Sequence, residues 1–166
     1  MPSTDTRTSA RTPTAPVRSA FGVLRRHPAG VRWAVLAVIS AGGAVGGLAR
    51  YAIGQAWPHP VTGFPCATFT INVTGCLLIG VLMVAVTDLW PSQRLIRPFL
   101  GTGVLGGYTT FSTYIVDAQH LISAGAAATA LAYLAATVVS ALLAVYAGVA
   151  ATRILLIRRR TIGDQA

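Results

Sequence analysis

Residues 106–113 read Gly-Gly-Tyr-Thr-Thr-Phe-Ser-Thr and interrupt an apolar run, residues 96–121, that is long enough to cross a bilayer. Two adjacent glycines and several hydroxyl residues weaken a helix. In hydrocarbon, such backbone is tolerated only where protein or a water-filled path surrounds it. The stretch therefore predicts a broken transmembrane helix, and it is the leading candidate for a pore or a binding site.

The composition around this stretch predicts an integral membrane protein. The chain has 166 residues, of which 54% are hydrophobic and 10% charged, and its mean hydropathy is +0.63. Each apolar run is close to the ~20 residues that span the hydrocarbon core. We expect an all-α membrane protein with four transmembrane helices, the third of them broken near the bilayer midplane. The runs are residues 33–55, 66–87, 96–121 and 126–152. They lie within an expected four-helix transmembrane domain at 32–154, which follows a disordered basic N-terminal tail at 1–31 and precedes a basic C-terminal tail at 155–166.

The basic residues predict the orientation of the chain. Thirteen arginines and no lysine give a net charge of +9. Six arginines precede the first run, two lie around the link between the second and third runs and four follow the fourth run, which leaves only Arg50. The links at 56–65 and 117–125 contain no arginine. By the positive-inside rule, both termini lie in the cytoplasm of a multi-pass plasma membrane protein. The charge does not indicate nucleic acid binding, and the N-terminal tail is either solvated or attracted to lipid headgroups.

Two polar residues in the first two runs leave alternatives open. Arg50, near the end of the first run, is either an interfacial anchor or an ion ligand. Asn72 is either a hydrogen-bonding contact between helices or a donor that lines a path. Pairs of glycines at i and i+4 in the first run predict close helix packing, within the subunit or between subunits; they are Gly42 with Gly46 and Gly43 with Gly47.

The break and the fourth run offer ligands for ions of both signs. Carbonyls freed by a broken helix can hold a cation, and half-helix N-termini attract anions. Phe111 and Tyr114 present ring edges to a small anion or serve as packing residues. In the fourth run a polar stripe lines a wet path or bonds to its own helix. Its members are Tyr133, Thr137 and Ser140.

Several classes of function lack their chemistry here. The four acidic residues are Asp5, Asp88, Asp117 and Asp164, and we expect none at mid-bilayer, so a proton relay cannot be assembled. No nucleotide-binding loop, metal-ligand cluster or nucleophile with its base is recognisable. The chain is therefore not expected to be an enzyme. Passive conduction is the simplest transport mode, and hydroxyl and amide donors without a fixed acid favour an anion.

The phrase at residues 106–114, Gly-Gly-Tyr-Thr-Thr-Phe-Ser-Thr-Tyr, resembles the signature of the small fluoride channels, the Fluc or CrcB family. Residues 42–51 in the first run, residues 70–75 in the second and the polar stripe of the fourth agree with it. The resemblance implies a passive, selective channel that lets cytoplasmic fluoride leave the cell and so reduces its toxicity. It also implies an antiparallel dimer of four-helix subunits in the lipid bilayer, with two pores.

Site residues follow from the same resemblance. Phe111 and Tyr114 are the expected aromatic pair, and Asn72 is a donor beside them. The backbone carbonyls of Gly106 and Thr109 are expected to hold a structural sodium ion that is not transported. The remaining expected members of the anion pathway are Ser112, Thr113, Tyr133, Thr137 and Ser140.

Two departures from the family pattern qualify these expectations. Tyr114 stands where the family usually has a second phenylalanine. The arginine bias predicts one fixed orientation, so the antiparallel partner is expected to be a separate homologue inserted the other way. Two rival functions are a small four-helix multidrug exporter, which needs a membrane-embedded glutamate that this sequence lacks, and a non-conducting membrane assembly subunit.

Overall fold

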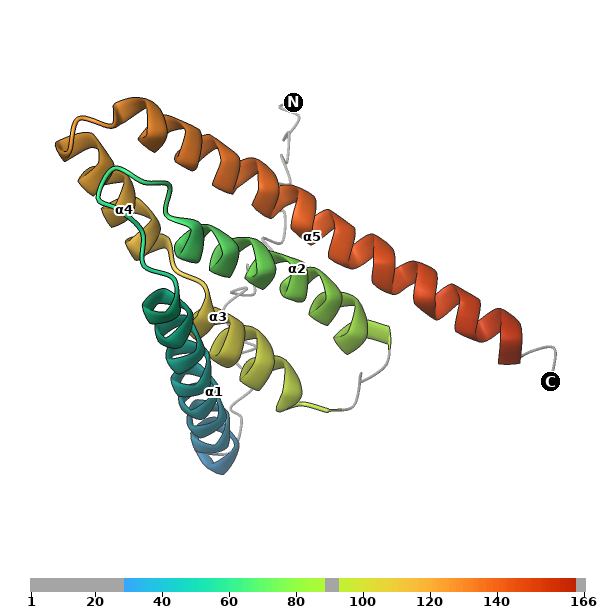
Figure 1. The fold of residues 1–166 in the computed structure, drawn as a ribbon. Helices are drawn as coiled ribbons and strands as arrows, with labels where there is room; N and C mark the ends of the chain where they lie inside the picture. The colour runs from blue at the N-terminus through green and yellow to red at the C-terminus, as the bar shows by residue number, and fades with distance from the viewer. Residues whose placement is uncertain (1–28, 89–92, 164–166) are drawn as a thin grey trace, which may run out of the picture.

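The computed structural model describes residues 29–88 and 93–163, with side chains for 33–88 and 93–157. All regular secondary structure in the described part is helical (Figure 1). Three of its helices are long and apolar enough to cross a membrane, which confirms an all-α protein of the membrane class. The elements are α1 (Ala29–Ala56), α2 (Cys66–Asp88), η1 (Arg97–Leu105), α3 (Gly106–Tyr108), α4 (Phe111–Ser123) and α5 (Ala127–Gly163).

The third apolar run forms three segments. The first, η1, is a π-helix, which the sequence did not predict. Helical bonding continues through the amide of Thr109, which donates to the Leu105 carbonyl at 3.0 Å. Thr109 (φ −76°, ψ 158°) and Thr110 (φ −150°, ψ 126°) are then extended, and helical backbone resumes at Phe111. The glycine- and hydroxyl-rich stretch thus contains two residues outside any helix.

The helices pack mainly in two pairs. α1 lies against η1 and α3, while α2 lies against α5 and has few contacts with α1 (Figure 1). Glycine allows the first pair to approach, because a Cβ on Gly46 would overlap the carbonyl oxygen of Val104. α4 packs on α5 through a cluster that includes Tyr114 and Tyr133. The break therefore lies where both pairs meet.

Two helices in the second half of the chain extend beyond the apolar runs predicted for them. The expected link at 117–125 is shorter, because α4 continues to Ser123 and ends in a Schellman motif around Gly125, whose φ is 77°. Asp117 therefore lies within α4. α5 continues beyond 152 to Gly163, through most of the range predicted as a C-terminal tail. The predicted N-terminal tail lies almost entirely outside the described residues.

Candidate functional site

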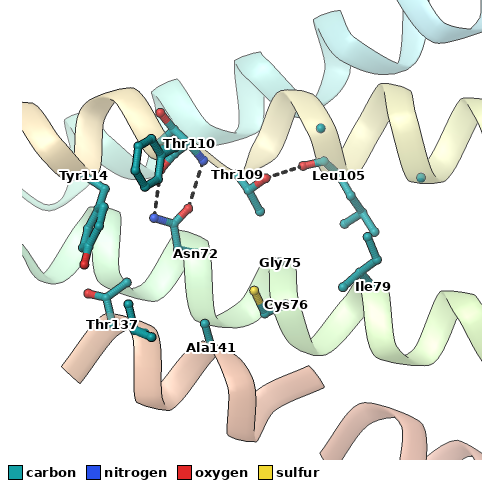
Figure 2. A pocket seen from close by; sticks show the side chains of 14 residues that line it. Asn72, Gly75, Cys76, Ile79, Leu105, Thr109, Thr110, Tyr114, Thr137 and Ala141 are labelled. Atoms are coloured by element: carbon teal, nitrogen blue, oxygen red, sulfur yellow. Dashed lines mark hydrogen bonds between the residues drawn. The ribbon is translucent and has the colours of Figure 1, made fainter. Parts of the chain in front are cut away.

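Asn72 of α2 contacts the break directly. Its Nδ2 donates to the carbonyl oxygen of Thr110 at 2.9 Å, and the Thr110 amide donates to its Oδ1 at 2.9 Å (Figure 2). The side-chain amide thus pairs with both hydrogen-bonding groups of one extended residue. A strand neighbour would pair in a similar way.

Hydrogen bonding around the break is redirected from the helical pattern. In a continuous α-helix the Thr110 amide would donate to the carbonyl of Gly106, and the Thr113 amide to that of Thr109. Instead, Thr110 donates to Asn72, and Thr113 donates to Oγ1 of Thr110 at 3.1 Å, which caps α4. The carbonyls of Gly106 and Thr109 therefore lose their usual helical donors.

Thr74 and Gly75 of α2 contact the N-terminal side of the break. Oγ1 of Thr74 and the hydroxyl of Tyr108 lie 2.9 Å apart and share a hydrogen bond. A Cβ on Gly75 would overlap the Thr109 methyl group, so glycine lets that side chain sit against α2. Thr109 also donates its hydroxyl to the Leu105 carbonyl at 2.9 Å. One turn of α2 thus contacts both ends of the interruption.

A cavity of about 380 Å³ lies beside the break, between α2, the third run and α5 (Figure 2). Its lining combines apolar surface with a few polar groups, as expected for a small-ligand site. Cys76 and Thr110 also line the cavity, although neither was among the predicted site residues; Cys76 follows Asn72 by one helical turn. Six predicted site residues line the cavity: Asn72, Gly106, Thr109, Phe111, Tyr114 and Thr137.

The two predicted aromatic residues differ in environment. The side chain of Phe111 is 75% exposed in the single subunit, and its ring centroid lies 5.9 Å from that of Tyr114. Tyr114 is buried, and its hydroxyl donates to the Leu134 carbonyl of α5 at 2.8 Å. The Tyr114 hydroxyl is therefore engaged by backbone, while its ring lines the cavity.

The three residues of the polar stripe on α5 lie in different environments. Thr137 lines the cavity and donates to the Tyr133 carbonyl on its own helix at 2.7 Å. Tyr133 is fully buried, and its hydroxyl lies 3.5 Å from Oδ2 of Asp117 on α4. Ala141, and not Ser140, continues the cavity lining after Thr137. Ser112 is exposed and lies outside this lining.

Arg50 and Thr113 line a second cavity, of about 320 Å³, between α1, α2 and the start of α4. Arg50 is half-buried there, near a hydrogen bond of 2.8 Å from Gln55 to the Tyr51 hydroxyl. Thr110 lines both cavities. Thr110, one of the two extended residues of the break, therefore borders two cavities, one of which is also lined by Arg50.

A protein-family model matches most of the chain. The model of the family described as CrcB-like protein, Camphor Resistance (CrcB), matches residues 37–149, which include the break and all residues that line the larger cavity. The chain belongs to the CrcB family. The match covers α2, η1, α3 and α4 completely and most of α1 and α5.

Three curated fluoride-specific ion channels are similar to this chain over most of their length. The fluoride-specific ion channel FluC 2 of Streptomyces avermitilis is 57% identical over 122 residues, 70% of this chain and 77% of the relative. FluC 1 of Streptomyces coelicolor is 55% identical over 122 residues, 73% of this chain and 79% of the relative. FluC 2 of Nocardia farcinica is 53% identical over 120 residues, 72% of this chain and 86% of the relative.

Proposed function

We propose that this chain is a subunit of a passive, fluoride-selective ion channel that lets fluoride leave the cytoplasm across the plasma membrane. The observation that carries the proposal is the interrupted third run, which exposes backbone and the Phe111 ring beside a cavity. The names of the three relatives support fluoride as the ion. We place the interruption near the bilayer midplane, where it must be surrounded by protein or water.

Ring edges and weak donors suit a small, strongly hydrated anion. The edges of Phe111 and Tyr114 carry positive potential. Thr137 and the amide of Asn72 add polar groups along the same cavity. A channel needs several weak sites in succession, because each must replace water without binding the ion too tightly for exit. None of the described residues that line this cavity is acidic, which favours an anion over a cation.

The carbonyls of Gly106 and Thr109 are the proposed ligands of a structural sodium ion. Carbonyl oxygens are hard donors that suit a hard cation. The support is that the amides of Thr110 and Thr113 donate elsewhere, and that Gly106 is exposed beside the cavity. A bound sodium ion would offset the partial negative charge of these oxygens.

A second subunit in the antiparallel orientation completes the proposed channel. The exposed Phe111 ring and the open surface at Gly47, where an added Cβ would meet nothing within 4 Å, leave an unpartnered face beside the break. By the positive-inside rule, the arginine bias supports an orientation with both termini in the cytoplasm. The partner is therefore a separately encoded homologue that inserts the other way.

Fluoride-electrode efflux from liposomes tests the proposal. The chain is reconstituted alone and together with an oppositely oriented homologue. We expect fluoride efflux, little chloride efflux, and loss of fluoride efflux in Phe111→Ile. The matched control is Thr152→Val, because that hydroxyl bonds only to the Gly148 carbonyl of its own helix at 2.8 Å and lies outside both cavities. A non-conducting assembly subunit predicts no efflux in any of these preparations.

A further inference from the structure

We propose that Asn72 is a positioning residue, which holds the Thr110 backbone extended and thereby keeps the Gly106 carbonyl available to a cation. The inference deepens the proposed function, because it assigns to this side chain the control of the backbone ligands. It differs from the role of an anion donor, which sequence and resemblance suggested for the same residue.

The geometry of the Asn72 side chain suits this role. A primary amide carries a donor and an acceptor on one planar group, as a peptide does. Both are used on Thr110, at 2.9 Å each, across 38 residues of sequence. Two parallel bonds fix the orientation of the bonded groups as well as their distance. The contact therefore specifies the extended conformation of Thr110 and not merely its proximity to α2.

The Thr110 amide has an alternative acceptor. The Gly106 carbonyl lies one helical turn earlier, where an uninterrupted helix would place the partner of this amide. While Asn72 accepts the Thr110 hydrogen, this bond is not made. Without Asn72 this partly buried amide would lose its acceptor, which favours return to the helical bond. The Gly106 carbonyl would then be occupied.

Two neighbours on α2 keep Asn72 in register with the break. Thr74 shares a hydrogen bond with Tyr108, the last residue of α3. Gly75 accommodates the Thr109 methyl group, which would collide with any larger residue there. Thr109 is thereby held next to Thr110, to which Asn72 is hydrogen-bonded. One turn of α2 thus positions Tyr108, Thr109 and Thr110 in succession.

Positioning and anion binding make different predictions for a serine at this position. Serine keeps a hydroxyl donor but is too short to pair with both groups of Thr110, and it readily bonds to its own helix. If Asn72 acts on backbone, Asn72→Ser behaves like Asn72→Ala. If Asn72 acts only as an anion donor, serine retains part of the function.

The test measures the thermal midpoint of the purified full-length chain in lipid nanodiscs, with sodium and with N-methylglucamine in its place. A ligand that binds only the folded state raises the midpoint. We expect sodium to raise it in the wild type and in Thr152→Val, and to have no effect in Asn72→Ala or Asn72→Ser. A sodium response that persists in either folded Asn72 variant overturns the proposal, as does its absence from the wild type.

Amide exchange of the wild type provides a test that does not require a variant to fold. We expect the Thr110 amide to exchange slowly with and without sodium, because Asn72 accepts its hydrogen in both conditions. Fast exchange overturns the proposal. Fluoride efflux is measured on the same preparations, so that the channel function and the positioning role of Asn72 are tested independently. A wild type that responds to sodium but does not conduct refutes the channel alone, and a conducting wild type without the response refutes the positioning role alone.

Discussion

Gly46→Ala, compared with Gly47→Ala, measures how closely α1 must approach the third run. A Cβ on Gly46 would overlap the Val104 carbonyl oxygen and lie 2.7 Å from the Tyr108 nitrogen. A Cβ on Gly47 would meet nothing within 4 Å. The two positions are adjacent on one helix, so their intrinsic helix propensities are nearly equal. The difference between the variants therefore isolates packing.

The magnitude follows from these contacts. Because backbone atoms cannot rotate away, α1 would have to move by roughly 1 Å to restore ordinary van der Waals separation. Overpacking of this kind costs about 3 kcal/mol at the upper end of its usual range. Replacement of glycine by alanine within a helix stabilises by about 1 kcal/mol. Gly46→Ala should thus lower the free energy of unfolding by about 2 kcal/mol, and Gly47→Ala should raise it by about 1 kcal/mol.

Denaturant unfolding in micelles at monomer-favouring dilution measures both values, and fluoride efflux is recorded in parallel. Efflux should fall in Gly46→Ala, because the displaced Tyr108 belongs to the segment before the break. A difference between the variants below about 0.5 kcal/mol, the scatter of neutral surface substitutions, would refute the packing of α1 on this segment. Reduced association in Gly47→Ala alone would locate the second subunit on the open face.

Three further outcomes are expected. Tyr114→Phe should retain fluoride efflux and lose about 1 kcal/mol of stability, because its hydroxyl bonds to the Leu134 carbonyl; loss of efflux in a folded variant would place that hydroxyl in the ion path. Withdrawal of sodium from both sides of the liposome should reduce wild-type efflux, and unchanged efflux would argue against the proposed cation. A reporter fused to the C-terminus should be found only in the cytoplasm, whereas mixed orientation would reject fixed insertion.

Hydropathy alone was sufficient to predict the three long helices, α1, α2 and α5. α2 begins and ends within one residue of its apolar run, since Pro65 precedes it and Asp88 ends it. α5 was underestimated, because its last turns are rich in arginine and hydropathy does not count them. Helical backbone does not require apolar side chains, and a helix of 37 residues continues beyond the apolar part of its sequence.

The geometry of the third run depended on tertiary contacts. Its composition indicated weak helix propensity at residues 106–113, but not that η1 would be π-helical. The amide of Gly106 donates to the carbonyl of Gly101, five residues earlier, as in a π-helix, and also to that of Gly103. Gly103 packs against the backbone of α1 at Ile39 and Gly42. Whether such a segment is α-helical or π-helical depends on contacts with residues that are distant in sequence, here those of α1.

Asn72 shows most clearly why sequence could not specify the site. The two interpretations, a contact between helices and a donor to a path, were treated as alternatives. A primary amide has two N–H donors and an oxygen acceptor. One donor and the acceptor bind Thr110, which leaves one N–H for the cavity that the side chain also lines. The alternatives are therefore compatible in one residue, and the experiments above separate them by asking which of the two functions a serine preserves.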